Sequence, residues 1–496
     1  MMTTYFEETV MESPSEMGFT TRLKQEIPEE DNETDPASYD PIQIEFGPYF
    51  IVKGGNVKPN PRAIVANFSS QRRIVFWDEA KAFLQYEETT GVWENITKDQ
   101  LKHELGDFYR DLAIGANKKE LAYTAGNSFF SSLVEVLKGW QLPNQREHNP
   151  KLFSVTNGVL DFNTIPPALK PNSAEYFFQH RAQFKWDSEA VCPQFKAFLS
   201  ASLLEEDISL IQRYCGSMFL GRNSDQKILV LKGTPGGGKS TLVTILEQIV
   251  GLKNVANLRT QHLGGRFEFS GFLGKRLLTG KDVPGDTLSL KSAQFLKSLV
   301  GGDLLQAEFK YAGKAEVWGK FHVVIACNNS LRIALDNDEG AWRRRLLIVR
   351  YDRPTIDKPI HDLAEKLIRE EGEGILAWLV QGAIAHAKEV DEKVGYQLTD
   401  RQKEAIESLI GESQSVRRFV ETQVEKGTNP CGVSTKELLD GYIMFCKKQC
   451  WTPLAEAKVQ KDIPSLMVSI HQKTQSHDLD RDSKSVRGYK QVKLLK

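Results

Sequence analysis

One segment limits the fold of this chain more than any other, because it joins a buried strand, a glycine-rich loop and an amphipathic helix. The apolar run Ile228–Leu231 leads into the loop Gly233–Ser240, and a stretch with helical apolar spacing follows. This order satisfies the pattern G-x-x-x-x-G-K-[ST] in the strand–loop–helix context that the pattern requires. Apolar strands alternate with helices throughout 222–355, so we expect a parallel α/β sheet there.

Each residue type in this loop has a physical reason to be there. Glycines let backbone N–H groups curl around a β-phosphate at the N-terminus of the helix. Lys239 brings a point charge to the β and γ oxygens, and the Ser240 hydroxyl is a ligand for Mg²⁺. The sequence therefore predicts a site for a nucleoside triphosphate with Mg²⁺. Its binding residues are Gly233, Thr234, Pro235, Gly236, Gly237, Gly238, Lys239, Ser240 and Thr241.

Polar residues follow the next two apolar runs of this region. The run 275–281 leads to Asp282, and the run 321–327 leads to Asn328. A carboxylate at a strand end can hold Mg²⁺ and water, and an amide beside the γ-phosphate can orient the attacking water. Asp282 is thus the candidate metal ligand and Asn328 the candidate for orienting water. For each of them an ordinary turn residue is the alternative.

Three arginines, Arg343 to Arg345, follow Trp342 and precede the apolar run 346–351. Beside a phosphate-binding loop, such a cluster can supply an arginine finger to a neighbouring subunit. A solvated turn is the alternative.

Composition argues against a globally basic nucleic-acid binder, a cysteine metal site and a membrane-spanning protein. The chain has 496 residues, which suggests about three domains. Its 64 Lys+Arg and 65 Asp+Glu give a net charge of −1, so any contact with nucleic acid must come from local patches. The six cysteines have no metal-ligand spacing. Without a signal segment or a run of about 18 apolar residues, we expect a soluble, cytoplasmic protein with no membrane contact.

The remaining segments differ in pattern. Residues 1–40 carry eleven acids and two bases, which predicts a disordered acidic arm. The runs IQIEF, YFIVKGG and RAIVANF within 41–73 are β-like, whereas 98–140 has helical spacing. Near the C-terminus, helical segments around 413–426, 434–450 and 455–468 precede a basic, hairpin-like end, and Ser434 is a candidate N-cap.

The order of these signals resembles the superfamily III helicases. More narrowly, the chain is similar to the helicase part of the phage/plasmid primase family and of poxvirus-type primase-helicases. The resemblance rests on the phosphate-binding loop, the acid after a strand, a lysine-bearing hairpin, the strand followed by Asn, and W-R-R-R before an apolar strand. The flanking segments VTNGVLDF, LIQRYCGSMFLG and EGILAWLVQGA agree with it. It covers about 150–496, and weakly 75–150.

The resemblance implies an α/β fold with a P-loop NTPase core of AAA+ type, an N-terminal α+β collar region and a C-terminal winged-helix domain. We assign six segments to it: 1–40, the acidic arm; 41–149, a small N-terminal α+β region; 150–221, a helical collar region; 222–355, the superfamily III helicase ATPase core; 356–410, a helical linker; and 411–496, the winged-helix DNA-binding domain.

The resemblance also implies a ring, usually a hexamer, that hydrolyses ATP between subunits and draws single-stranded DNA through its pore. Lys239 and Ser240 would hold ATP and Mg²⁺, Asp282 would be the acid, and Asn328 the sensor. Either Arg344 or Arg345 would be the finger that acts in trans, and the sequence does not choose between them.

Two basic segments are candidate DNA contacts. In residues 306–315, implied to be the pore hairpin, Lys310 and Lys314 would grip phosphates and Tyr311 or Phe309 would stack on bases. The alternative is an exposed hairpin with solvated lysines. In the C-terminal ribbon the candidates are Lys484, Arg487 and Lys490. A solvated basic tail is the alternative there.

The chain departs from the family pattern in two ways. Many relatives have two acids at the end of the second strand, whereas Lys281 precedes Asp282 here. The sequence therefore does not identify the base that activates water, and Asp286 or a more distant acid is a candidate. The space before residue 150 is also short for a primase domain, so we expect no primase activity in this chain and a separate primase or initiator partner.

Together these features predict an ATP-dependent hexameric DNA helicase for the replication of a virus, phage, plasmid or integrated mobile element. The alternative is an origin-binding initiator in which ATP switches assembly without processive unwinding. A remodeller of protein or a packaging motor is a third possibility.

Overall fold

The computed structural model describes residues 40–77, 82–139, 149–265, 268–285, 288–308, 314–328, 331–335, 338–353, 360–428, 432–481 and 484–495. The expected acidic arm, apart from Asp40, lies outside these residues. The chain forms two compact units. The first comprises the chain up to Gln71 together with Leu105–Val136, and the second comprises Arg72–Glu104 together with Leu137–Lys496.

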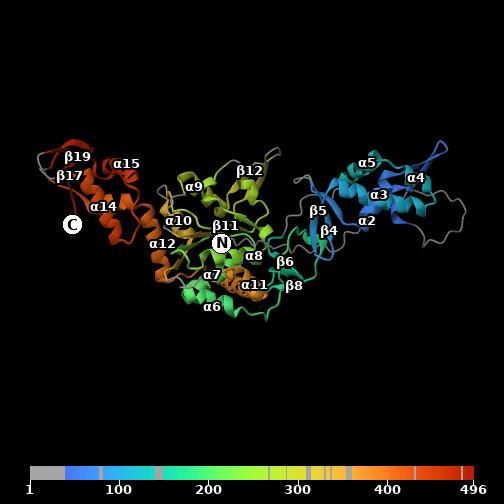
Figure 1. Ribbon diagram of the computed structural model, residues 1–496, viewed down its shortest axis with the longest axis horizontal. Helices are drawn as coiled ribbons and strands as arrows, with labels where there is room; N and C mark the ends of the chain where they lie inside the picture. The colour runs from blue at the N-terminus through green and yellow to red at the C-terminus, as the bar shows by residue number, and fades with distance from the viewer. Residues whose placement is uncertain are drawn as a thin grey trace, which may run out of the picture. The chain divides into compact units, whose positions relative to one another are not determined.

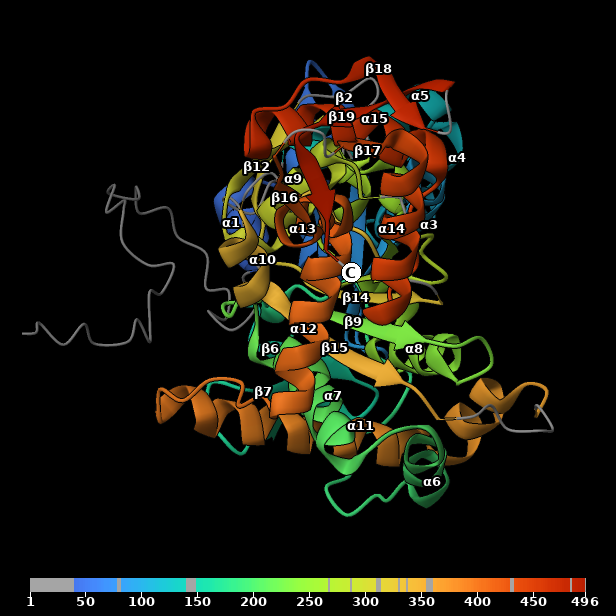
Figure 2. The same ribbon diagram turned by 90° about the vertical axis from the view of Figure 1, so that its left-hand side faces the viewer.

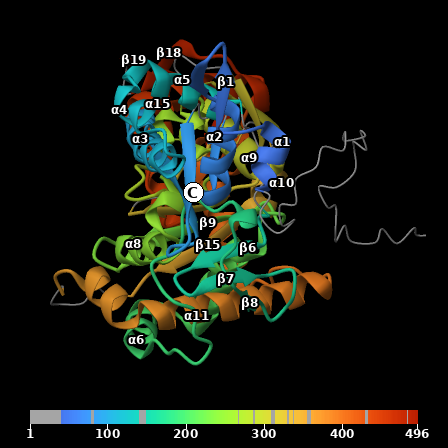
Figure 3. The same cartoon turned by 90° about the vertical axis from the view of Figure 1, so that its right-hand side faces the viewer.

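The first unit is mainly helical (Figure 3). Its elements are α1 (Pro41–Phe46), β1 (Phe50–Lys53), β2 (Asn56–Pro59), α2 (Pro61–Gln71), α3 (Lys98–Gly115, which begins in the second unit), α4 (Lys119–Thr124) and α5 (Asn127–Lys138). Its packing is aromatic: the rings of Phe68 and Phe108 meet edge to face at 5.4 Å, and those of Tyr109 and Phe129 at 5.0 Å. The helical prediction for 98–140 is confirmed.

The β-like prediction is wrong for IQIEF and RAIVANF, which lie in α1 and α2. Each helix starts at a proline, whose fixed φ and missing N–H suit the first helical position. Asp40 caps α1, because its side chain accepts a hydrogen bond from the backbone N–H of Ile42. Short apolar runs do not by themselves separate strand from helix, and here the prolines decide. The run YFIVKGG does contain a strand, β1.

Two small antiparallel sheets precede the central sheet of the second unit. One has the order β3 (Ile74–Trp77), β4 (Ala82–Glu87), β5 (Val92–Ile96); the other, visible in Figure 3, has the order β6 (Leu152–Val155), β7 (Gly158–Asp161), β8 (Ala168–Lys170). Trp93 on β5 forms two hydrogen bonds to the segment that follows β8. Its backbone N–H donates to Phe178 O (2.6 Å) and its indole N–H donates to Ala174 O (3.0 Å). The segment we assigned as 41–149 is therefore divided between the two units.

The central sheet has five parallel strands in the order β10-β11-β14-β9-β15. They span Val255–Asn257 (β10), Leu277–Gly280 (β11), His322–Cys327 (β14), Ile228–Gly233 (β9) and Leu346–Tyr351 (β15). The predicted parallel α/β sheet is thereby confirmed. Its helices are α6 (Pro193–Ser202), α7 (Glu205–Ser217), α8 (Lys239–Val250), α9 (Leu290–Gly301), α10 (Glu339–Arg345), α11 (Leu363–Asp391) and α12 (Asp400–Ser413).

Helices cover both faces of this sheet (Figures 1 and 2). Alternate strand residues such as Leu229 and Leu347 pack with α6, α7, α8 and α11. Their neighbours, such as Ile228 and Leu346, pack with α9, α10 and α12. This alternation follows from the two-residue period of a strand, and it explains why the strands are apolar without interruption. Within the described residues, no helix is both long and apolar enough to cross a membrane.

An antiparallel hairpin, β12 (Leu304–Glu308) and β13 (Lys314–Trp318), follows α9. Its strands pair from Leu304 opposite Trp318 to Glu308 opposite Lys314. This is the segment expected to form the pore hairpin. Its turn, with Phe309, Lys310 and Tyr311, lies outside the described residues, as does the side chain of Lys314.

The C-terminal part combines helices with antiparallel strands. Its elements are α13 (Ser415–Gln423), β16 (Val424–Lys426), β17 (Gly432–Ser434), α14 (Thr435–Lys448), α15 (Glu456–Leu466), β18 (Ser476–Arg481), β19 (Lys484–Lys490) and β20 (Val492–Leu494). The three predicted helices and the hairpin are confirmed, although α13 ends early because β16 follows and pairs with β20. Ser434 caps α14 in a reciprocal capping box with Glu437, as predicted.

The remaining short turns of helix are Ala174–Tyr176, Met218–Leu220, Leu252–Asn254, Thr260–His262, Phe269–Phe272 and the π-type turn Met467–His471. The buried Glu412 at the end of α12 links the central sheet to the C-terminal part. Its carboxylate lies 3.3 Å from Lys232 Nζ at the end of β9, and it accepts a hydrogen bond from the backbone N–H of Thr452 at 3.0 Å.

Candidate nucleotide-binding site

The phosphate-binding loop occupies the carboxyl end of β9 and leads directly into α8. Gly233 has φ 154° and Gly238 has φ 90°, values in the left-handed region that favours glycine. Side chains would also collide there. A Cβ on Gly233 would lie 2.3 Å from Tyr351 O, and one on Gly238 would lie 2.7 Å from the ring of Phe198 on α6. The loop conformation therefore depends on glycine at both positions.

Lys239, the first residue of α8, is only 4% exposed. Its ammonium donates to two carbonyl oxygens of the loop, Gly233 O at 2.9 Å and Thr234 O at 2.6 Å. Burial lowers the pKa of Lys239, while the nearby Asp282 acts in the opposite direction. A charged amine with neutral partners at a helix N-terminus is suited to receive an anion. Thr234, Pro235 and Gly236 are exposed, so the loop can be reached from solvent.

The two predicted strand-end residues lie together at the same edge of the sheet. Asn328 follows β14 and Asp282 lies two residues beyond β11, and these strands are neighbours. The Asn328 side chain donates to Asp282 Oδ1 at 3.3 Å. Asp282 has φ 51°, a left-handed conformation that Asp tolerates better than most residues. The next residue, Val283, donates its N–H to Ala326 O of β14 at 2.9 Å.

Two oxygen-bearing side chains in this region fit Mg²⁺. Ser240 is the second residue of α8, directly after Lys239, and Asp282 is exposed at the strand end. Hydroxyl and carboxylate oxygens are the ligands that Mg²⁺ takes, together with phosphate oxygens and water. The glycine cradle and the buried ammonium add the phosphate-binding half of such a site.

A partly exposed polar cluster beside Asp282 was missed by sequence reasoning. Lys281 Nζ lies 2.7 Å from Glu247 Oε2 on α8 and 3.0 Å from Thr244 Oγ1. The other oxygen of Glu247 accepts a hydrogen bond from Thr279 Oγ1 at 2.6 Å. The only signal in the sequence was that Thr244 and Glu247 lie on the helical face of Ser240, at spacings i+4 and i+7.

The three arginines have different surroundings. Arg345 is 7% exposed and donates to Ala341 O at 3.0 Å, and burial lowers its pKa. Arg343 forms an ion pair with Glu407 of α12. Arg344 is exposed, and its side chain has no ion-pair partner among the described residues. The cluster therefore presents one arginine to solvent without a carboxylate partner.

The predicted DNA contacts of the C-terminal ribbon do not share one face. Lys484, Arg487 and Lys490 all lie on β19 and are all exposed. Because side chains alternate along a strand, Lys484 and Lys490 lie on one face and Arg487 on the other. Lys490 is also paired with Asp478 of β18, at 2.7 Å.

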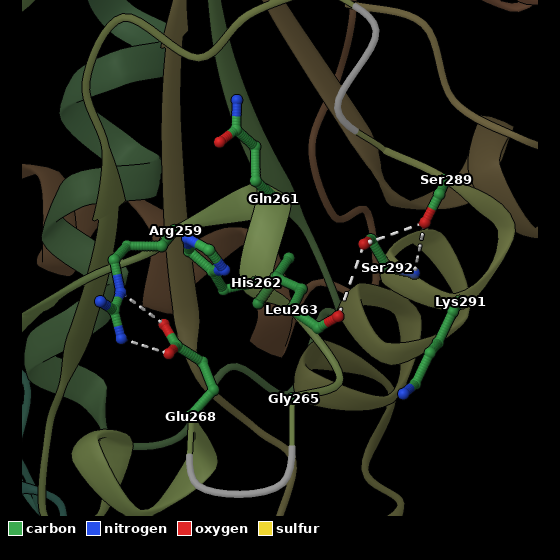
Figure 4. Close-up of a pocket in the computed structure, with 9 residues that line it drawn as sticks. All are labelled: Arg259, Gln261, His262, Leu263, Gly265, Glu268, Ser289, Lys291 and Ser292. Atoms are coloured by element: carbon green, nitrogen blue, oxygen red, sulfur yellow. Dashed lines mark hydrogen bonds and ion pairs between the residues drawn. The ribbon is translucent and has the colours of Figure 1, made fainter.

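The cavity in Figure 4 is separate from this site. It has a volume of about 540 Å³ and lies between the segment after β10 and the start of α9. Its lining residues are Arg259, Gln261, His262, Leu263, Gly265, Glu268, Ser289, Lys291 and Ser292. Arg259 is paired with Glu268, and Figure 4 shows Gln261 and Lys291 pointing in different directions. None of these residues belongs to the phosphate-binding loop or to the strand ends that carry Asp282 and Asn328.

Comparisons with known proteins add two family matches. Residues 70–202 match a family described as D5 N terminal like, and residues 231–345 match a family of unknown function, DUF5906. The second match includes Lys239, Asp282, Asn328 and the arginines. No curated protein was found to match the chain.

Solved structures offer weaker similarities. The apo structure of the NrS-1 C terminal region (305-718) has a TM-score of 0.46 and 12% identity, covering 87% of this chain and 99% of that one. The A form apo structure of the NrS-1 C terminal region has a TM-score of 0.43 and 11% identity, with coverages of 86% and 98%. Each family match is a similarity over the residues that it covers, and neither spans half of the chain.

Proposed function

We propose that this chain is an ATP-dependent DNA helicase that serves the replication of a virus, plasmid or integrated mobile element. The resemblance implies that it works as a ring, usually a hexamer. The observation that carries the proposal is the arrangement of Lys239, Asp282 and Asn328 at one edge of the central sheet. A lysine for phosphate, an acid for Mg²⁺ and an amide for water are the groups that hydrolysis of a triphosphate needs.

The strand order supports a core of AAA+ type. β14 lies between β9, which leads into the phosphate-binding loop, and β11, which leads to Asp282. Asn328 therefore follows a strand flanked by the loop strand and the acid strand. An amide at that position can orient a water toward the γ-phosphate while the loop holds the β-phosphate.

In the reaction, the water oxygen bonds to the γ-phosphorus and the bond from that phosphorus to the β–γ bridging oxygen breaks, giving ADP, phosphate and a proton that passes to solvent. Backbone N–H groups of the loop and the Lys239 ammonium hold the phosphates. Ser240 and Asp282 would hold Mg²⁺, which neutralises phosphate charge when bound. Asn328 orients the water. Little covalent chemistry falls to the protein, so positioning and charge account for the catalysis.

Arg344 is the better candidate for the finger that acts on a neighbouring subunit. A finger must leave its own subunit, and Arg344 is exposed. Arg345 is buried and bonded to Ala341 O within its own chain. Moving it outward would break that hydrogen bond and leave a gap beside α9 and α10.

The proposed DNA contacts are the hairpin β12–β13 and the C-terminal part, taken as a winged helix. For the hairpin, the proposal assigns DNA contacts to Lys310, Tyr311 and Lys314, whose side chains lie outside the described part of the chain. In the C-terminal part, Lys484 and Lys490 share a face of β19 and would contact phosphates. Such contacts give affinity without sequence choice.

The test is the ATPase rate with and without single-stranded DNA, measured together with particle mass by light scattering and unwinding of a forked duplex. We expect a ring-sized particle whose hydrolysis is stimulated by DNA and which separates the strands. A monomer that binds ATP but ignores DNA would contradict the proposal. DNA binding with nucleotide-dependent assembly but no unwinding would point to an initiator instead.

A further inference from the structure

The residue before Asp282 is a lysine, Lys281, whose positive charge lies next to a proposed ligand of a metal cation. Lys281 precedes the residue that we propose as a ligand of Mg²⁺, and an ammonium at this position would compete with the metal for the Asp282 carboxylate. In the structure this ammonium is bonded elsewhere: Nζ lies 2.7 Å from Glu247 Oε2 and 3.0 Å from Thr244 Oγ1. The side chain of Lys281 is 36% exposed and that of Glu247 is 14% exposed, so water screens the pair only in part.

Both oxygens of Glu247 are engaged. Oε1 accepts a hydrogen bond from Thr279 Oγ1 at 2.6 Å, and Thr279 is itself buried on β11. The Glu247 carboxylate therefore binds the side chains of both Lys281, directly before Asp282, and Thr279, three residues before it. Each oxygen of Glu247 thus has a protein partner, one on β11 and one directly after it.

The spacing along α8 connects this cluster to the site. Ser240, Thr244 and Glu247 are separated by four and three residues, so they lie along one face of the helix. Ser240 is at the end of the face where the phosphates would bind, and Glu247 is two turns further on. The cluster thus ties the end of β11 to the helix that carries the proposed metal ligand.

We propose that Glu247 is a positioning residue that holds the Lys281 ammonium away from Asp282, which keeps the Asp282 carboxylate available to Mg²⁺. The inference rests on the proposed nucleotide site and adds a specific role to a residue that contacts neither nucleotide nor metal. It also explains how the chain tolerates Lys281 directly after β11, where many members of the family that it resembles have a second acid.

The test compares Glu247→Gln, Lys281→Met and the double variant in the full chain. The readout is the Mg²⁺ concentration that half-saturates the Mg²⁺-dependent binding of a fluorescent ATP analogue, with hydrolysis as a second readout. In Glu247→Gln the ammonium is released, and we expect this concentration to rise by about 3- to 10-fold, the scale of one partly screened charge interaction. Lys281→Met should not raise it.

The double variant separates positioning from simple structural support. If Glu247 acts through the Lys281 ammonium, removing that ammonium should return the half-saturating concentration to within about twofold of the wild type. A double variant as impaired as Glu247→Gln would overturn the inference. Glu373→Gln, which breaks the exposed pair of Lys185 and Glu373 at 3.6 Å, is the matched control and should change nothing.

Failure of the inference and failure of the proposed function have different signatures. If the wild type binds no ATP analogue with Mg²⁺, the proposed function is wrong. If the wild type binds the analogue and Glu247→Gln has the same Mg²⁺ dependence, only the role of Glu247 is wrong. If Glu247→Gln does not fold, the Mg²⁺ dependence of Lys281→Met still tests the inference, because an increase there would contradict it.

Discussion

The nucleotide edge of the central sheet and the C-terminal ribbon place their polar residues in opposite ways. At the edge, Lys239, Asp282 and Asn328 come from distant parts of the sequence and lie together because parallel strands end at one edge. In the ribbon, Lys484 and Arg487 are close in sequence but lie on opposite faces of β19. Sequence proximity is therefore a poor guide to a shared site, whereas strand order is a good one.

The largest expected effect is at the edge of the sheet. Lys239→Ala removes the buried ammonium that the phosphates need, so ATP hydrolysis should fall by roughly 10³-fold or more. The measurement is steady-state phosphate release at saturating Mg²⁺. Lys253→Ala, at an exposed lysine just beyond α8, is the control and should retain full activity. If Lys239→Ala still hydrolysed ATP at the wild-type rate, the edge of the sheet would not be the ATPase site, and its contrast with the ribbon would lose its main support.

The arginines test whether the edge is completed by a second subunit. Arg344→Ala should lower hydrolysis by about 10²- to 10³-fold with unchanged stability, because it removes one charge from the transition state. Mixing Arg344→Ala with Lys239→Ala should restore activity that neither variant has, since some interfaces then contain both intact residues. No recovery on mixing would exclude action in trans.

Arg345→Ala should behave differently from Arg344→Ala. It removes a buried side chain bonded to Ala341 O, so the free energy of unfolding should fall by about 1–3 kcal/mol. Denaturant unfolding of both variants measures this. If Arg345→Ala is fully stable but inactive, the assignment of the two arginines must be exchanged.

A smaller effect is expected where the loop meets α6. Gly238→Ala places a Cβ 2.7 Å from the Phe198 ring and strains a residue at φ 90°. We expect a loss of about 1–3 kcal/mol in stability, together with weaker nucleotide binding by equilibrium titration. Gly340→Ala is the matched control, because a Cβ there meets nothing within 4 Å. Equal effects of the two changes would show that the loop conformation does not matter.

The smallest effects should come from the ribbon. If Lys484 and Lys490 contact phosphates from one face, replacing both with Ala should reduce the salt dependence of DNA binding by about two phosphate contacts. Arg487→Ala should leave that slope unchanged. The measurement is DNA affinity as a function of salt concentration. A slope that changes equally for Arg487→Ala would mean that strand faces do not divide the contacts.

The part of the site that could be predicted is the part governed by local or topological rules. The strand, loop and helix around Lys239 follow from a contiguous motif. Asp282 and Asn328 follow from the rule that parallel strands end at the same edge. By contrast, the pairing of Glu247 with Lys281 depends on which helix covers β11, and no local pattern contains that information.

Other differences also have physical reasons. The sequence pattern predicts strands where α1 and α2 form, because runs of five to seven residues are too short for their period to be read. Pro41 and Pro61 are the local signals for the two helix starts. Burial of Arg345 was not predictable, because its guanidinium lies beside Gly301 at the end of α9, which is distant from it in the sequence.

The two hydrophobic clusters share one sheet, and this has a consequence for unfolding. Each of β9, β14 and β15 sends alternate residues into opposite clusters, so the two clusters share these three strands. A slip of one residue in any of these strands would exchange the side chains that the two clusters receive, and both clusters would have to repack. We therefore expect the loss of any of these strands to disrupt both clusters together, in one cooperative unit.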